Sequence, residues 1–288
     1  MIRRLWARWL AYCGRETDAR PLALTRVLLP IMLILDLGRL IQLGLVDDLF
    51  RHYDQGGIHT VLNPHLWLDN LSPEWGGPIA VGVVMAALAC VSAGVLYRPA
   101  LVVALVGYAQ LGHLCGPSDR GIDRILRTVM LILIFSEAHR HFSLKKPWLD
   151  RISAWPQDLV RYLLVLVYVN SGIAKLLGDP AGWLGFQGIP QLYRIIVNPV
   201  AGHVDPVAAL DWTWFFWLGG WFTIALEVSA PLLLTRYAHW WALAGVALHL
   251  GIATTMELGM FSWGMLALYP ILFAESPWLS GRRPNASS

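Results

Sequence analysis

The sequence has few charged residues. Asp, Glu, Lys and Arg make up 14% of its 288 residues, whereas hydrophobic residues make up 56%. Soluble domains are usually about one quarter charged, so this composition excludes a soluble domain of useful size. The net charge of +3 is small, and the positions of the charges are more informative than their sum.

The sequence also lacks the usual motifs of metal, nucleotide and nucleic-acid sites. Its three cysteines, Cys13, Cys90 and Cys115, form neither an even disulfide framework nor a metal-ligand spacing. No glycine-rich loop precedes a helix, and no Ser-His-Asp order is visible. We therefore expect no disulfide, no metal and no binding to nucleic acid.

Two further absences concern the ends of the chain and its internal symmetry. Residues 1–21 are basic but have neither a long apolar core nor a small-residue cleavage site. We expect them to form a cytoplasmic amphipathic lead-in rather than a cleaved signal peptide, and we expect residues 276–288 to form a polar cytoplasmic tail. No two-half repeat with paired broken helices is visible, which disfavours a transporter.

Long apolar stretches are what the sequence does contain. About 20 apolar residues in a helix cross the roughly 30 Å of bilayer hydrocarbon, and such stretches recur from residue 22 to residue 275. We predict an all-α, polytopic transmembrane bundle of about eight helices (range seven to nine) in a single domain, residues 22–275. The predicted helices cover residues 22–45, 78–97, 99–116, 122–137, 157–178, 212–235, 238–256 and 259–275.

The basic residues predict the orientation of the bundle. If both termini are cytoplasmic, thirteen Lys and Arg residues face the cytoplasm and only three face outward, as the positive-inside rule requires. Loops 46–77 and 179–211 then lie outside, with a re-entrant or interfacial piece at residues 185–197. Most tryptophans, including Trp183 and Trp241, stand near segment ends and are expected in the headgroup layer.

Charged residues inside the apolar stretches each need a reason, because a charge in hydrocarbon costs a few kcal/mol. Asp36 and Arg39 share one helical face, and we favour an internal tether over a site for this pair. Arg124, Arg127 and Arg161 lie within about two turns of a predicted helix end, from where their side chains are expected to snorkel to water.

Lys175 is the strongest candidate for chemistry. It follows Tyr168, Ser171 and Gly172 on one helical face, and Ser171 and Gly172 allow close approach of a neighbouring helix or a flat ligand. A lysine in apolar surroundings can become neutral and take up a proton. The alternative is that Lys175, near its helix end, snorkels outward.

Two segments resemble a known family. In YVNSGIAKLLGDPAGWL (168–184), the positions of Tyr168, Gly172 and Lys175 resemble a stretch of the vitamin K-dependent gamma-glutamyl carboxylases. In HLGIATTMELGMFSWGMLALYPILF (249–273), His249 stands twelve residues before Phe261, within a pattern similar to the same family. The opening ALTRVLLPIMLILDLGRL (23–40) resembles the wider bacterial group called the horizontally transferred transmembrane (HTTM) domain.

The resemblance implies an activity and a site. In the carboxylases, the lysine that matches Lys175 is the base that deprotonates vitamin K hydroquinone, and carboxylation of a substrate Glu follows. The resemblance therefore implies Lys175 as a catalytic base on the outer side, with a reduced quinone (vitamin K or menaquinol) as cofactor. Its pocket would include Tyr168, Gly172, Glu227, His249 and Phe261.

Departures from the carboxylases open a second hypothesis. Where they have Asn-His before the fourth helix, this chain reads Gly121-Ile122-Asp123, and the sequence shows no large propeptide-recognising domain after the helices. The alternative is a non-catalytic accessory membrane protein for maturation or export of a secreted peptide. Under either hypothesis we expect a multi-pass protein of a bacterial inner membrane, in contact with lipid and possible partners: a secreted peptide or a partner membrane protein.

Overall fold

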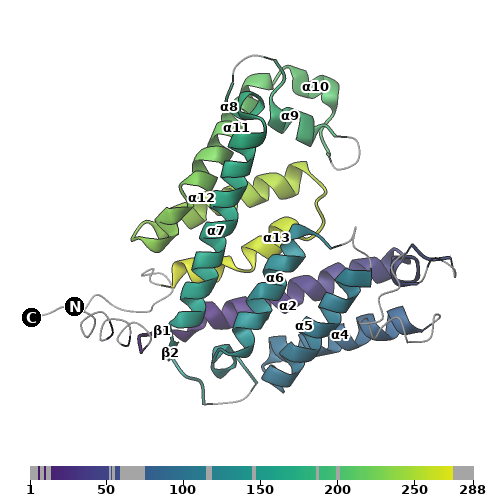
Figure 1. Ribbon diagram of the computed structural model, residues 1–288, viewed down its shortest axis with the longest axis vertical. Coiled ribbons are helices and arrows are strands. Elements are labelled where there is room, and N and C mark those ends of the chain that lie inside the picture. The colour runs from purple at the N-terminus through teal and green to yellow at the C-terminus, as the bar shows by residue number, and fades with distance from the viewer. Residues whose placement is uncertain are drawn as a thin grey trace, which may run out of the picture. The chain divides into compact units, whose positions relative to one another are not determined.

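The computed structural model confirms that the chain is all-α (Figure 1). It describes residues 14–51, 75–114, 119–144, 147–185, 188–198 and 202–274, together with residues 6, 10, 53 and 56–58. The chain divides into two compact units, Met1–Gln157 and Asp158–Ser288. The predicted tail 276–288 and most of the lead-in 1–21 before residue 14 lie outside the described residues.

Unit 1 is built from four longer helices: α2 (Ala19–Gln42), α4 (Gly76–Ala93), α5 (Tyr97–Leu114) and α6 (Gly121–Ile134). Helix α4 packs on both α2 and α5, and α5 packs on α6 (Figure 1). Shorter elements are α3 (Leu45–Phe50) and a 3-10 turn, η4 (Ala138–Arg140). Strands β1 (Glu16–Asp18) and β2 (Arg151–Ser153) pair antiparallel and were not predicted.

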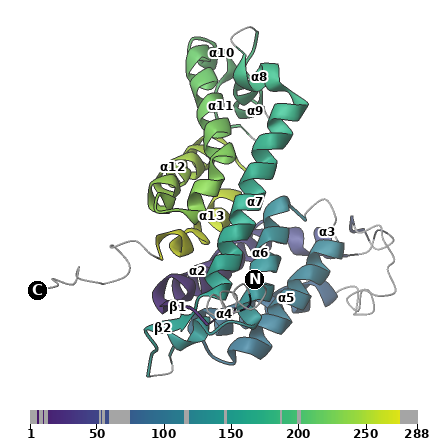
Figure 2. The same cartoon turned by 60° about the vertical axis from the view of Figure 1, so that its left-hand side comes forward.

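Unit 2 contains nearly all of α7 (Trp155–Gly178) with α11 (Thr213–Val228), α12 (Ala238–Thr255) and α13 (Phe261–Leu266). The 3-10 turns η5 (Ala230–Leu234) and η6 (Tyr269–Phe273) follow α11 and α13. Three short helices, α8 (Pro180–Leu184), α9 (Gln191–Ile196) and α10 (Pro206–Leu210), gather at one end of α7 and α11 in both views (Figures 1 and 2). They occupy the loop in which a re-entrant or interfacial piece was expected.

The short helices begin where the sequence provides a cap. Both α8 and α10 start at an Asp-Pro pair, Asp179-Pro180 and Asp205-Pro206. The Asp179 side chain accepts from the backbone N–H of Gly182, and Asp205 accepts from the N–H groups of residues 207 and 208. Proline has no N–H to leave unsatisfied in the first helical turn, so these pairs start helices inside a long connecting segment.

Each of the eight predicted apolar stretches contains helical residues, with starts within three residues of those predicted. The ends differ more: helix α11 ends at Val228, before η5, and the last stretch is divided between α13 and η6. By length and composition, three helices in the described part of the chain can cross a membrane: α2, α4 and α7. The prediction of eight membrane spans and that of two cytoplasmic termini stay predictions.

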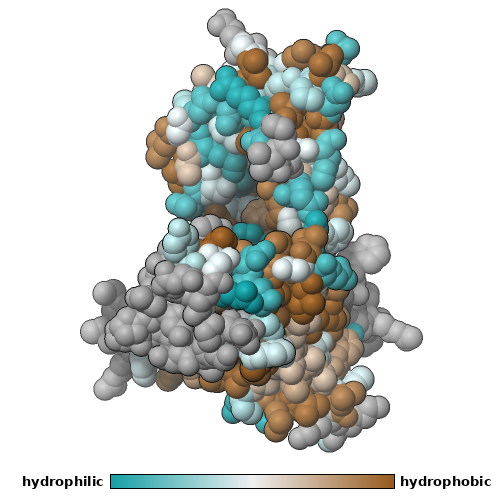
Figure 3. Space-filling model, turned by 90° about the vertical axis from the view of Figure 1, so that its right-hand side faces the viewer, coloured by the Kyte–Doolittle hydropathy of each residue, from teal (hydrophilic) through white to brown (hydrophobic). Residues whose placement is uncertain are grey.

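The exposed surface of the helices is apolar. Only 22% of the most apolar 18-residue window of α7 is buried, and Leu166 and Leu177 on this helix are among its most exposed side chains. Hydrophobic residues form several patches on the face in Figure 3, next to hydrophilic ones. A helix that is apolar on its exposed side suits lipid rather than water, so the surface supports a membrane protein.

Candidate functional site

Helix α7 carries three of the predicted site residues, Tyr168, Gly172 and Lys175, on one face, and α11 packs closely against that face. A Cβ atom added at Gly172 would lie 3.1 Å from the Glu227 Cβ and 3.0 Å from the Val228 Cγ2. The small residue at position 172 therefore admits a neighbouring helix, which is one of the two uses expected for it. This close approach brings α11 and its Glu227 alongside the polar positions of α7.

Lys175 forms an ion pair with Glu227. Its Nζ lies 2.6 and 2.8 Å from the Glu227 Oε1 and Oε2 atoms, and 2.6 Å from the Ser171 Oγ. The Ser171 hydroxyl in turn donates to Glu227 Oε1 at 3.0 Å. The side chain of Lys175 is 23% exposed and that of Glu227 only 8%, so Lys175 is bound within unit 2 rather than extended outward.

The polar cluster around Lys175 also has an aromatic neighbour. The Trp183 ring lies with its centroid 5.4 Å from the Lys175 Nζ, a distance at which a cation is attracted to the ring face. Trp183 is buried, so its ring contacts protein, and its expected place in the headgroup layer stays a prediction. Helix α8 positions this ring because its Asp-Pro start turns the chain directly after α7 ends.

Tyr168 belongs to a second cluster, with His249 on α12 and Tyr269 in η6. The Tyr168 hydroxyl lies 2.6 Å from the His249 Nε2 and 2.6 Å from the Tyr269 hydroxyl. All three side chains are buried. Since a tyrosine hydroxyl carries one hydrogen and accepts others, Tyr168 can donate to one of these partners and accept from the other.

Space for this cluster depends on Gly245, one helical turn before His249. A Cβ atom at position 245 would lie 2.4 Å from the Tyr269 hydroxyl oxygen, which is closer than real Cβ contacts allow. The Trp241 ring packs edge-on against Tyr168, with centroids 4.8 Å apart, and its indole N–H donates to the Leu226 carbonyl. Trp241 is thus part of the core of unit 2, and its expected place in the headgroup layer stays a prediction.

Two buried polar atoms of this region have no hydrogen-bond partner in the structure. They are the Nδ1 of His249, a residue that is 1% exposed, and the Oγ of Ser262. The Phe261 ring lies 5.7 Å from the His249 ring, centroid to centroid. Buried polar groups are nearly always bonded, so an unpartnered imidazole nitrogen beside an aromatic ring is a candidate contact point for a ligand.

The structure thus brings the predicted site residues together in two clusters: Lys175 with Glu227 and Gly172, and Tyr168 with His249 and Phe261. Sequence reasoning missed Tyr269, Trp241, Gly245 and Ser262. Ser262 and Tyr269 carried a local signal, because both are hydroxyl residues inside the family-like segment 249–273. Trp241 and Gly245 are common residue types in apolar stretches, and their roles depend on which helices meet.

Three charged residues have partners that the sequence analysis did not predict. Two of them were expected to snorkel and one to form a tether along its own helix. The buried Arg161 donates to the Ile271 carbonyl, and the expectation that it snorkels is wrong. Arg127 pairs with Asp119 and is also largely buried. Asp36 pairs with Arg120, a residue 84 positions later, in addition to any contact along its own helix.

The family model of the HTTM domain matches residues 14–278 of this chain, which includes both units. No solved structure matches the chain. A match over nearly the whole length, together with α2, α4 and α7, each able to cross a bilayer, identifies a membrane protein. The chain belongs to the HTTM domain family, a carboxylase-related family of membrane proteins.

Proposed function

We propose that this protein is a membrane enzyme of quinol-dependent, carboxylase-like chemistry in which Lys175 acts as the base. The observation that carries the proposal is the cluster of Lys175, Glu227 and Ser171 on the facing sides of α7 and α11. A lysine bound inside a membrane domain next to a carboxylate has a partner with which it can exchange a proton.

The residues near these clusters fit a reduced quinone, which is a flat ring with two hydroxyl groups. The Phe261 ring beside His249 offers an aromatic surface, and the unpartnered Nδ1 of His249 and Oγ of Ser262 can each bond to a ring oxygen. When bound, the reduced quinone would supply an acidic hydroxyl and the four electrons that oxygen accepts when it forms quinone epoxide and water.

The chain's own part is proton transfer at Lys175. As an ammonium group, Lys175 donates to three acceptors and has no lone pair. A base needs that lone pair, so a proton must first pass from Nζ to a Glu227 carboxylate oxygen, over a contact of 2.6 or 2.8 Å. The amine then takes up a proton at Nζ, and Glu227 holds the first one until it is released.

A second candidate is the non-catalytic accessory protein for a secreted peptide, and the same ion pair favours it. Lys175 has an acceptor for each ammonium hydrogen, which is what a tether between α7 and α11 requires. Under this candidate the pair is purely structural, and its loss weakens the fold without changing any chemistry.

The test uses the purified chain in nanodiscs with vitamin K hydroquinone or menaquinol, oxygen and bicarbonate. We expect quinone epoxide by mass spectrometry from the parent chain, and a loss of about 100-fold or more in Lys175→Ala, since positioned general bases contribute at least that much. Glu227→Gln, which keeps the shape of the side chain but not its charge, is expected to lower the rate as well.

Arg151→Ala, an exposed change outside both clusters, is the matched control and should leave the rate unchanged. Binding of quinone is followed separately by quenching of tryptophan fluorescence. If the folded parent chain binds quinone and forms no epoxide, the enzymatic proposal is wrong, and the accessory function becomes the better interpretation.

A further inference from the structure

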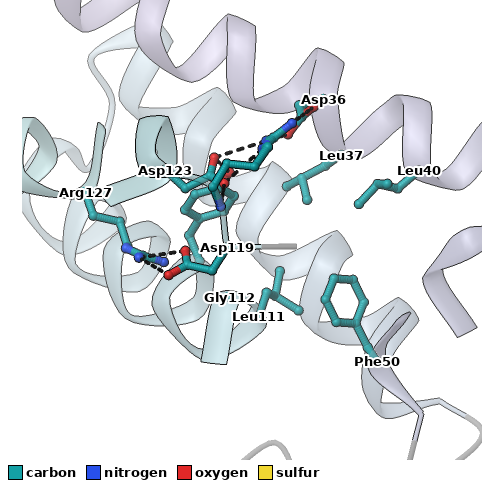
Figure 4. A pocket seen from close by; sticks show the side chains of 11 residues that line it. Asp36, Leu37, Leu40, Phe50, Leu111, Gly112, Asp119, Asp123 and Arg127 are labelled. Atoms are coloured by element: carbon teal, nitrogen blue, oxygen red, sulfur yellow. Dashed lines mark hydrogen bonds and ion pairs between the residues drawn. The ribbon is translucent and has the colours of Figure 1, made fainter. Parts of the chain in front are cut away.

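Unit 1 contains a cavity of about 180 Å³. It lies between α2, α3, α5 and the start of α6 (Figure 4). Its walls are of two kinds, an ionic side and an apolar side. The lining residues of the ionic side are Asp36, Tyr108, Asp119, Arg120, Asp123 and Arg127, and those of the apolar side are Leu37, Leu40, Phe50 and Leu111, with Gly112 between the two.

Arg120 holds two of the carboxylates of the ionic side. Its guanidinium donates to both oxygens of Asp36 and both oxygens of Asp123. Tyr108 donates its hydroxyl to Asp123 Oδ1 at 2.8 Å. Burial alone lowers the pKa of Arg120, but the hydrogen bonds and charges of the two carboxylates outweigh it and raise that pKa.

Asp119 is paired in the same way with two other arginines. Its Oδ2 accepts from Arg127 Nη2 at 2.9 Å and from Arg124 Nε at 3.2 Å. Burial raises the pKa of Asp119, but the hydrogen bonds and charges of Arg127 and Arg124 together hold it below its ordinary value. Each of the three carboxylates of the wall is therefore paired with a guanidinium group, Asp36 and Asp123 with Arg120, and Asp119 with Arg127 and with Arg124, which lies outside the lining. A charged ligand would find no uncompensated partner in this cavity.

Two buried atoms of the cavity wall nevertheless lack a hydrogen bond: Arg127 Nη1, a donor, and Asp119 Oδ1, an acceptor. Oδ1 is 2.7 Å from Arg127 Nη2, but the contact does not meet the geometry of a hydrogen bond. Both atoms lie against Gly112, where an added Cβ would be 2.6 Å from Nη1 and 2.9 Å from Oδ1. The absence of a side chain at this position leaves the donor and the acceptor side by side.

The apolar wall fixes the size and character of a ligand. Leu37, Leu40 and Phe50 line the opposite side of the open space from the paired Asp119 and Arg127 (Figure 4). An apolar cavity of about 150 Å³ in another protein binds benzene, so a cavity of this volume holds one ring of that size with a small substituent.

We propose that this cavity binds a small neutral hydroxyl compound with an apolar body, of the size of a phenol. A hydroxyl oxygen accepts the N–H of Arg127 Nη1 and donates its hydrogen to Asp119 Oδ1, which satisfies both unpartnered atoms through one ligand atom. The apolar body lies on Leu37, Leu40 and Phe50. Neutrality follows because each carboxylate of the wall already has a guanidinium partner. The proposal is independent of Lys175, which belongs to the other unit.

Titration of 4-fluorophenol into the full chain in nanodiscs, followed by fluorine NMR, tests the proposal. We expect it to bind about tenfold more tightly than fluorobenzene, because hydrogen bonds to charged groups contribute this much or more. We expect 4-fluorobenzoate and 4-fluorobenzylammonium, of opposite charge, to bind more weakly than 4-fluorophenol. Tighter binding of either ion would overturn the proposal of a neutral ligand.

Two variants separate the cavity from partitioning into lipid. Leu40→Trp fills the space and should abolish binding, whereas Leu35→Trp adds the same ring on the exposed side of α2 and should leave binding unchanged. Arg127→Lys keeps a positive charge opposite Asp119 but removes the Nη1 donor. In this variant 4-fluorophenol should no longer bind more tightly than fluorobenzene.

Equal binding of 4-fluorophenol by the parent chain and Leu40→Trp, or no binding by the folded parent chain, contradicts the proposal. If Leu40→Trp does not fold, Arg127→Lys decides, since an unchanged advantage of 4-fluorophenol over fluorobenzene would exclude the proposed hydrogen bonds.

Discussion

His139 lies in η4 of unit 1, and its neighbours determine its charge. Its ring stacks on Tyr97 with centroids 4.7 Å apart, and its Nδ1 is buried without a hydrogen-bond partner. Burial, followed by the charges of Arg140, Arg98 and Arg26, lowers the pKa of His139 below its ordinary value. The folded protein therefore holds this imidazole in its neutral form over a wider pH range than the unfolded chain does.

This difference predicts a loss of stability in mild acid. The unfolded chain binds a proton at His139 as the pH falls through about 6.5, and the folded chain does so only at lower pH. The contribution of neutral His139 to the free energy of unfolding is complete above about pH 6.5. It decreases below that pH until the pKa of His139 in the folded protein is reached. The melting temperature in detergent should fall from pH 7.5 to pH 5.5, and His139→Gln should show a smaller fall. An equal fall in both proteins would exclude His139 as the cause.

Helix α4 ends against a buried arginine of another helix. Arg26 on α2 is fully buried, and its guanidinium donates to the carbonyls of Val91 and Ser92 in the last turn of α4. The same side chain donates to the carbonyls of His141 and Phe142. The last carbonyls of a helix lack partners within the helix and carry partial negative charge, so Arg26 holds the end of α4 and the later loop together.

Replacement of this arginine should destabilise unit 1 strongly. Arg26→Met removes the side-chain donor of four carbonyls, of which that of Val91 keeps a bond from the Gly94 N–H. We expect a loss on the order of 3 kcal/mol, since each of the three carbonyls left unsatisfied costs about 1 kcal/mol or more. The measurement is thermal unfolding of the purified protein in detergent. Arg98→Met removes an exposed arginine at the start of α5 and should change the melting temperature little. Equal melting of the two variants would show that the four bonds contribute nothing.

The helices of both units expose large hydrophobic side chains, and the predicted orientation of the chain in the membrane rests on the distribution of its basic residues. We predict that the loop with α9 and α10 lies outside and that the turn between η5 and α12 lies in the cytoplasm. A cysteine-free variant that carries either Val207→Cys or Arg236→Cys tests this, because both positions are exposed. In intact cells an impermeant maleimide should label only the first, and the second only after permeabilisation. The reverse pattern would invert the predicted topology.

The local sequence was sufficient to predict that each of the eight apolar stretches is helical and that α7 has a polar face, but not to predict the short helices α8 and α10. Tyr168, Gly172 and Lys175 lie on one face because their spacing matches the helical period. The partners of those residues were less accessible. Glu227 and His249 entered only through the family resemblance, and Tyr269 was not found, because a hydroxyl in an apolar stretch carries no information about the helix it will meet.

The sequence by itself determined that the chain is helical and that its apolar stretches suit a membrane. It also determined that the few charged residues within those stretches need specific partners. Apolar run length and helical period are properties of short segments, so no knowledge of distant residues is required. Only the tertiary structure decided the partners: Arg120 for Asp36, Glu227 for Lys175 and Asp119 for Arg127. In lipid each buried charge must be compensated by whichever group packing brings within hydrogen-bond distance, and that choice is made between helices rather than along them.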